Sequence, residues 1–252
     1  GYQAPFGFSV VTVTVIYAVY AAGVLASLLL AGRWSDTIGR KPMLIAGLAF
    51  AAVSDLVFIA AGDLAMLLIG RVLSGISAGL YVGAGTAAVV EAAPPAWQSR
   101  ASLVATAVNI GGLGLGPLLA AVLVDTLPWP LHLTYAVHLG LAVLLLAALS
   151  RVPETVIVQP GARVRLAPPA GVPRPVRSLF MAAAISSFAG FSVLGLLTAL
   201  SPWLVAIALG KPSHVVQVSV AVTIFASSVL AQVLLRRLAA GQAVVLGTAL
   251  LS

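Results

Sequence analysis

Ionisable side chains are scarce in this sequence, so those inside apolar stretches are the first candidates for chemistry. The chain has 252 residues, with 13 Lys and Arg against 6 Asp and Glu. Asp55 and Arg71 each lie within a long apolar segment. By helical rise, each is about 10 Å from the end of its segment that adjoins the loop around Asp63. A charge at that depth in a bilayer needs a partner or a polar path. We therefore expect either a structural Asp55–Arg71 pair or an Arg71 that faces a cavity and handles substrate or protons.

A second pattern is typical of serine hydrolases. Residues 75–79 read G-I-S-A-G, which matches the G-x-S-x-G nucleophile motif, and His138 would be the base. Ser77 is expected about 20 Å deep in its span and His138 about 10 Å deep, whereas a nucleophile and its base must approach to about 3 Å. An intramembrane serine protease therefore stays a remote alternative. His132 and His138 would lie on different helix faces without a nearby carboxylate, and cysteine is absent, so we expect no metal site.

The segments that carry these residues are too apolar for a soluble domain. The sequence is 61% hydrophobic and 8% charged, and its mean hydropathy is +1.14. A soluble domain has about 25% charged residues. Apolar stretches long enough to cross a bilayer recur along the chain, which predicts an all-α, polytopic membrane helix bundle. The expected spans are residues 8–31, 42–61, 64–90, 101–124, 131–150, 179–209 and 213–235, with an incomplete eighth from 241 onward.

Lys and Arg gather in alternate loops between these spans. One set of loops, residues 32–41, 91–100, 151–178 and 236–240, holds eleven of them, whereas the opposite set holds only Lys211. Because cytoplasmic loops carry the excess of Lys and Arg, the first set is predicted to be cytoplasmic. The formal net charge of +7 therefore indicates membrane topology and not nucleic-acid binding. Residues 151–178 contain six prolines and five arginines, which predicts a cytoplasmic linker, extended or lying on lipid headgroups.

The loop between the first two spans carries a defined motif. Residues 32–41 read GRWSDTIGRK, in which the motif positions are Gly32, Asp36, Gly39, Arg40 and Lys41. The segment resembles the signature loop of the major facilitator superfamily, G-x-x-x-D-x-x-G-R-[RK], which lies between that family's second and third helices. Thr37 stands where many members have a second Arg.

The resemblance also implies a cytoplasmic latch. In the family, the loop Arg meets an acid at the cytoplasmic end of the fourth helix. Arg40 would then bridge Asp36 and Glu91, and Arg100 would lie at the same membrane face. Exposed pairs of this kind contribute about 0 to 1 kcal/mol each, which suits a switch. An ordinary solvated charge cluster that only fixes topology is the alternative.

Two further segments agree with the family in the expected order. Residues 70–75 are similar to the R-x-x-x-G pattern of its fourth helix. Residues 112–121 resemble the G-x-x-x-G-P-x-x-G-G pattern of its fifth helix, which is associated with drug:proton antiporters, with Ala120 and Ala121 in place of the last two glycines. The resemblance runs from the family's second helix to the start of its ninth, so we expect the chain to be an excerpt.

Small residues are spaced for helix packing in lipid. Glycines at every fourth position form grooves in which two backbones can approach, and a following proline favours a bend. The positions concerned are Gly75, Gly79, Gly83, Gly112, Gly116 and Pro117. Candidate cavity residues are Arg71, Tyr81 and Asn109, with Tyr17 and Tyr20 as further ones.

These observations and the resemblance together predict a transporter of two pseudo-symmetric bundles. The expected parts are an N-terminal bundle over 1–150, the linker 151–178, and an incomplete second bundle over 179–252. The predicted function is proton-coupled efflux of small hydrophobic compounds by alternating access, by a monomer in a bacterial cytoplasmic membrane, without cofactors. A metabolite or sugar facilitator or symporter of the same fold is the alternative.

Overall fold

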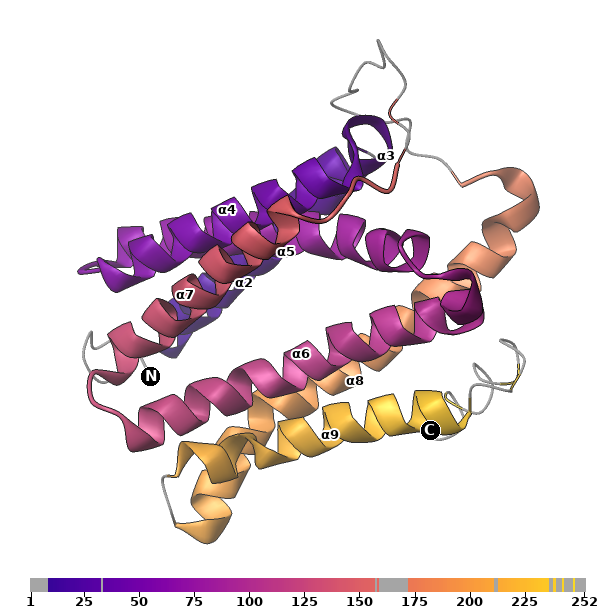
Figure 1. The fold of residues 1–252 in the computed structure, drawn as a ribbon. Helices are drawn as coiled ribbons and strands as arrows, with labels where there is room; N and C mark the ends of the chain where they lie inside the picture. Colours follow the sequence, from indigo (N-terminus) through magenta and orange to yellow (C-terminus); the bar gives the residue numbers. More distant parts are fainter. Residues whose placement is uncertain are drawn as a thin grey trace. The chain divides into compact units, whose positions relative to one another are not determined.

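The computed structural model describes residues 9–32, 34–156, 158, 172–210, 213–235, 238, 242 and 247. Its described part is built from helices joined by short connections (Figure 1). Seven of these helices are long and apolar enough to cross a membrane, which confirms the predicted fold class. In chain order the helices are α2 (Val10–Ala31), α3 (Trp34–Ile38), α4 (Arg40–Ile59), α5 (Leu64–Glu91), the 3-10 turn η1 (Pro95–Trp97), α6 (Gln98–Thr126), α7 (Pro130–Ser150), the 3-10 turn η2 (Arg174–Val176), α8 (Arg177–Leu209) and α9 (His214–Leu234).

Local signals explain where several helices begin. The Ser9 hydroxyl accepts a hydrogen bond from the Thr12 backbone N–H at the start of α2, at 3.1 Å. The Asp63 carboxylate does the same for Met66 at the start of α5, at 2.8 Å. Such N-caps satisfy backbone donors that have no partner within the helix. Pro130 occupies the first position of α7, where its missing N–H is not needed.

The described contacts divide the chain into two units. Unit 1 comprises residues 1–105 and 128–169, and unit 2 comprises residues 106–127 and 170–252. Helix α6 therefore contributes its first turns to unit 1 and the rest to unit 2. The sequence places all of this helix in the N-terminal bundle, and that domain assignment stays a prediction.

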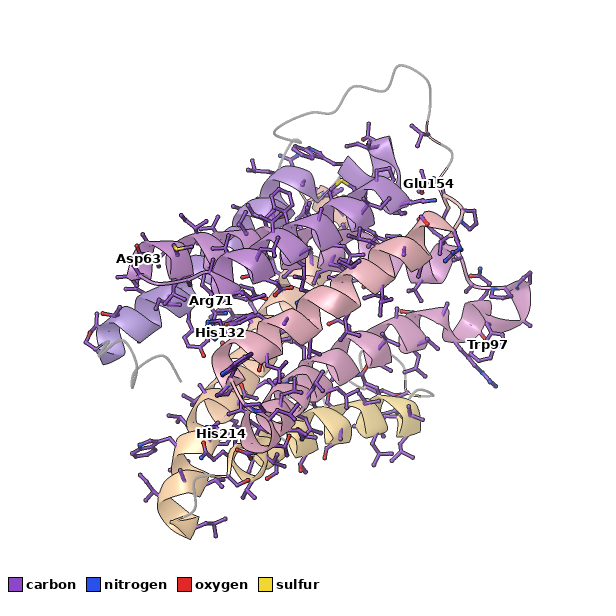
Figure 2. All side chains as sticks on the ribbon, turned by 60° about the vertical axis from the view of Figure 1, so that its left-hand side comes forward. Asp63, Arg71, Trp97, His132, Glu154 and His214 are labelled. Atoms are coloured by element: carbon purple, nitrogen blue, oxygen red, sulfur yellow. The ribbon has the colours of Figure 1, made fainter. Side chains whose placement is uncertain are left out.

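Unit 1 contains α2, α3, α4, α5 and α7. Helix α5 packs against α2 and α4, and α7 packs against α4. Two groups of buried side chains fill these contacts, one around Met43, Leu44 and Leu80, and one around Phe58 and Leu67. Figure 2 shows Asp63 and Glu154 at opposite ends of these helices, so the unit has two distinct polar ends.

Unit 2 contains α8, α9 and most of α6. Helix α8 packs against α9. A Cβ atom added to Gly114 of α6 would lie 3.2 Å from the Cβ of Phe225 of α9, so these two helices also meet closely. The Asp125 carboxylate, near the end of α6, accepts hydrogen bonds from the backbone N–H groups of His214 and Val215 at 3.2 and 3.0 Å. It thereby caps α9.

The structure refines the expected boundaries. The signature loop contains the short helix α3, and α4 begins at Arg40, two residues before the expected start of the second span. Pro117 and Pro202 each lie inside a helix that the structure assigns as continuous, α6 and α8. The eighth segment from 241 onward and the central part of the linker lie outside the described residues, apart from single positions.

Candidate functional site

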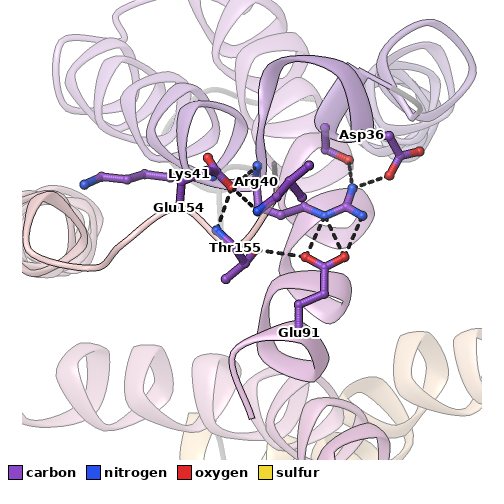
Figure 3. A network of polar contacts seen from close by, with 8 residues as sticks. Asp36, Arg40, Lys41, Glu91, Glu154 and Thr155 are labelled. Carbon is purple, nitrogen blue, oxygen red and sulfur yellow. Dashed lines mark hydrogen bonds and ion pairs between the residues drawn. The ribbon is translucent and has the colours of Figure 1, made fainter. Parts of the chain in front are cut away.

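The side chain of Arg40 lies at the centre of a group of polar contacts, the Arg40 cluster, with Ser35, Asp36, Glu91 and Thr155 (Figure 3). Its Nη1 lies 2.6 Å from Asp36 Oδ1 and donates to the Ser35 hydroxyl at 2.6 Å. Its Nη2 and Nε donate to the two carboxylate oxygens of Glu91 at 2.8 and 3.2 Å. The contacts expected between Arg40, Asp36 and Glu91 are therefore present.

The two acids of the cluster, Asp36 and Glu91, differ in how far they are buried. The Arg40 side chain is only 12% exposed, whereas those of Glu91 and Asp36 are 34% and 58% exposed. Glu91 also receives the two-pronged contact, which is the stronger geometry for an Arg–carboxylate pair. A carboxylate at the last residue of a helix faces the negative end of the helix dipole, so it needs such a cation. Glu91 is thus the main partner of Arg40 and Asp36 the weaker one.

Gly39 sets the direction in which Arg40 enters α4. Its φ of +112° lies in the region that glycine adopts easily and other residues rarely do. A Cβ atom added here would also meet the Glu154 carboxylate and the Pro42 ring. The conformation therefore favours glycine at position 39, and a larger residue would also displace the Glu154 side chain. Gly32, the other glycine of the motif, ends α2 with an ordinary helical φ of −57°.

Sequence reasoning missed the contribution of the residues just after α7. The Glu154 carboxylate accepts hydrogen bonds from the backbone N–H groups of Arg40 and Lys41, at 2.8 and 3.0 Å, and thereby caps α4. Thr155 donates its hydroxyl proton to Glu91 at 2.8 Å. We call residues 151–156 the strap, because they bind both the start of α4 and the end of α5.

The backbone N–H groups around Glu154 of the strap favour the charged form of its carboxylate. Partial burial raises the pKa of Glu154, but hydrogen bonds from the N–H groups of Val156, Arg40, Lys41 and Thr155 hold it below its usual value. In the sequence, Glu154 is only an acid a few residues after a span. Chain order does not link it to the start of α4, which lies more than a hundred residues earlier.

The other charged residues of the predicted site are Lys41 and Arg100, and they differ in their contacts. The Lys41 ammonium donates to the backbone carbonyl of Ser150 at 2.8 Å, and so it compensates the C-terminal end of α7. Arg100 is exposed, and within the described residues it has no ion pair. The structure does not bring Arg100 to Glu91.

Asp55 has a partner that differs from the expected one. Its Oδ2 lies 2.7 Å from Nδ1 of His138, which projects from α7. The expected pair with Arg71 is not found in the described part of the chain. The Asp55 side chain is 6% exposed and that of His138 is 61% exposed. Chain order alone could not reveal this pair, because it depends on α7 packing against α4.

The guanidinium of Arg71 contacts two aromatic rings. Its guanidinium carbon is 5.1 Å from the centre of the Tyr17 ring and 5.5 Å from that of Phe58, which are cation–π distances. Its Nε is buried and has no hydrogen-bond partner among the described residues. A buried donor without an acceptor is destabilising.

The glycines of α5 meet α2 at the level of the backbone. A Cβ atom on Gly75 would lie 2.5 Å from the Tyr20 carbonyl oxygen and 3.0 Å from the Gly23 Cα. On Gly79 it would lie 2.6 Å from the Ser27 Cβ. We call this contact, formed by Gly23, Gly75 and Gly79, the glycine seam.

Glycines with the same spacing elsewhere do not form such a contact. A Cβ on Gly83 would approach one leucine methyl group at 3.9 Å, and on Gly112 or Gly116 it would meet nothing within 4 Å among the described residues. Their packing role stays a prediction, as does a bend at Pro117.

The candidate cavity residues lie in different units. Tyr81 of α5 is 37% exposed, and a Cβ added at Gly47 of α4 would lie 3.1 Å from its ring. Asn109 is exposed on the part of α6 that belongs to unit 2. Their role in a cavity stays a prediction.

The serine hydrolase arrangement has no support in this geometry. Ser77 is buried within α5, and the described contact of His138 is with Asp55. Among the residues searched, no three His, Cys, Asp or Glu side chains are grouped to hold a metal ion.

Comparison with known proteins identifies the family. The sequence matches the profile described as Major Facilitator Superfamily over residues 1–252. The chain belongs to this superfamily. Its members are membrane transporters and generally not enzymes. With seven span-length helices among its described residues, the chain is an integral membrane protein.

Among curated relatives, the chain is similar to a triacylglyceride transporter of Mycolicibacterium smegmatis, with 37% identity over 113 residues, which are 44% of this chain and 18% of that protein. It is similar to multidrug resistance protein 1 of Bacillus subtilis, with 37% identity over 98 residues, which are 37% of this chain and 25% of the relative. It is also similar to multidrug resistance protein MdtL of Citrobacter koseri, with 26% identity over 133 residues, 53% of this chain and 34% of the relative. The chain thus matches well under half the length of each.

Proposed function

We propose that this protein exports small hydrophobic compounds across a bacterial cytoplasmic membrane in exchange for protons, by alternating access. The observation that carries the proposal is the superfamily match together with relatives named as multidrug resistance proteins. The relative named as a triacylglyceride transporter supports a hydrophobic cargo. A rocking motion of two bundles is the usual way in which folds with internal repeats expose a central site to each side in turn.

The Arg40 cluster is the proposed switch of this motion. Its ion pairs are partly exposed, so each contributes only about 0 to 1 kcal/mol. A few kcal/mol are enough to set the populations of two conformations. Several weak contacts at one membrane face can therefore bias the protein toward one state without holding it there permanently. The strap adds further contacts of the same kind.

The test is efflux of ethidium from cells that express the intact protein. We expect ethidium to leave faster than from cells with an empty vector, and the difference to disappear when nigericin collapses the pH gradient. Export that continues without the gradient would indicate a facilitator. Uptake in place of export would indicate a symporter. Either result would contradict proton-coupled efflux.

A further inference from the structure

Asp55 is the one acid of this chain that lies inside a predicted span and not at its end. The sequence has 6 Asp and Glu. The others lie in α3, at the cap of α5, in the last turns of α5 and α6, and in the strap. Asp55 is four residues before the end of α4, about 6 Å along the helix, and it is buried at 4% exposure. An ionisable group inside a membrane span is energetically costly, so Asp55 is a candidate for a functional residue.

His138 is held against Asp55 by the register of α4 and α7. Three residues further along α4, Phe58 stacks on Tyr135, with ring centres 4.7 Å apart, and Tyr135 is three residues before His138. The two contacts are three residues apart on each of the two antiparallel helices. They therefore fix how α4 and α7 are aligned along their length. The 2.7 Å contact between Asp55 and His138 is therefore set by the packing of the helices and not by two free side chains.

The net charge of the Asp55–His138 pair depends on one proton. With a neutral imidazole, Nδ1–H donates to the Asp55 carboxylate and the pair carries one negative charge. A proton that adds to Nε2 forms an imidazolium, and the net charge becomes zero. Only one N–H bond is made or broken in this step. Because an uncompensated charge is costly away from water, the protonated pair is the favoured form when no other cation approaches Asp55.

The cation considered as a replacement for that proton is Arg71. Its guanidinium lies against the ring of Phe58, which follows Asp55 by one helical turn on α4. Its buried Nε has no acceptor among the residues that the structure describes. When the pair is deprotonated, Asp55 offers that acceptor. The other titratable groups that face this region are Tyr17 of α2, under the guanidinium, and Tyr135 of α7.

We infer that Asp55 and His138 bind the coupling proton, and that Asp55 exchanges His138 for Arg71 when the proton leaves. The inference rests on the proposed proton-coupled function and names its proton site. The His138 side chain is 61% exposed in this chain, against 6% for Asp55, so the imidazole is the more accessible group of the pair. The inference accounts for the contact with His138 and for the unpartnered Nε of Arg71.

The first test needs no substrate. The chain has only 3 His, so the imidazole nitrogens of the purified intact protein can be followed by NMR after ¹⁵N-histidine labelling. We expect His138 to be an imidazolium at neutral pH in the unaltered protein, and to lose that proton at a lower pH in the Asp55→Asn variant, which lacks the neighbouring carboxylate charge. His132, which lies at the start of α7, is the internal control and should not change. A neutral His138 ring from about pH 5 upward, or no effect of Asp55→Asn, would overturn the inference.

The second test separates the inference from the proposed function. In ethidium efflux, His138→Gln and Asp55→Asn are expected to lose the dependence on the pH gradient, whereas His132→Gln keeps it. If the unaltered protein shows no gradient dependence, the proposed function is wrong. If it does and both variants behave like the unaltered protein, the proton site is wrong. Arg71→Lys, which keeps the charge, should retain more of the dependence than Arg71→Gln, because the exchange needs a cation.

Discussion

Two kinds of helix contact occur in unit 1. In the glycine seam, α5 meets α2 so closely that a Cβ atom on Gly75 would lie 2.5 Å from a carbonyl oxygen. Helix α4 packs apolar side chains against α5 and adds charged contacts, with Arg40 on Glu91 of α5 and Asp55 on His138 of α7. The first contact is limited by volume and the second by charge. Substitutions that change one property should therefore affect only one of the two.

Gly75→Ala should have the largest effect, because it adds volume where none is free. Its Cβ would lie 2.5 Å from the Tyr20 carbonyl oxygen, which belongs to a helix backbone and cannot move aside by itself. Overpacking of this kind destabilises proteins by about 1 to 3 kcal/mol. The measurement is the thermal unfolding midpoint of the detergent-purified protein, which should fall at every pH. An unchanged midpoint would show that the seam is looser than described.

Glu91→Gln should have the next largest effect, because it removes charge at nearly constant volume. It leaves the Arg40 guanidinium, only 12% exposed, with Asp36 as its remaining acid. We expect a loss of about 1 kcal/mol in the stability of the cluster and slower ethidium efflux with normal membrane insertion. The measurements are efflux rate and accessibility of single cysteines introduced into this cysteine-free chain.

Asp36→Asn is the matched control for Glu91→Gln. Its side chain is 58% exposed and makes one contact with Arg40, so its effect should have the same direction and be smaller. Equal effects would mean that the two acids act as one unit. No effect of either would leave the Arg40 cluster with a role in topology alone.

Acid pH should weaken the contacts of α4 and leave the glycine seam unaffected. The backbone N–H groups hold the pKa of Glu154 below its usual value of about 4.3. Its stabilising contribution is therefore complete at neutral pH and is lost as the pH falls through the lowered value. Glu154→Gln should remove this part of the acid sensitivity, as measured by the unfolding midpoint between about pH 3 and pH 7. The midpoint difference between Gly75→Ala and the unaltered protein should stay constant.

Gly83→Ala should have the smallest effect and the opposite sign. A Cβ there meets only one methyl group, at 3.9 Å. Alanine is favoured over glycine within a helix by up to about 1 kcal/mol, so the unfolding midpoint should stay or rise slightly. A clear fall would show that the seam extends beyond Gly79.

The contrast also shows what the sequence could reveal. Hydropathy predicted the spans, because each must be long and apolar. The local i,i+4 spacing predicted the contact between Arg40 and Asp36, whereas the contact between Arg40 and Glu91 was implied by the resemblance to the family. Glycine spacing alone did not separate Gly75 from Gly116. The same period occurs where a described neighbour lies within 4 Å of an added Cβ atom and where none of the described residues does. The partners of Asp55 and of Arg40's backbone depend on how α7 packs. Such contacts join segments about eighty to more than a hundred residues apart, and no local pattern encodes them.

The Glu154 contact has a consequence for mutational scanning. The carboxylate recognises two peptide groups, those of Arg40 and Lys41, and not their side chains. Exchange of either side chain leaves both N–H groups in place, so a scan of positions 40 and 41 would not detect this part of the strap's attachment. It becomes visible when Glu154 is changed, or when a proline at position 40 or 41 deletes one of the two N–H groups.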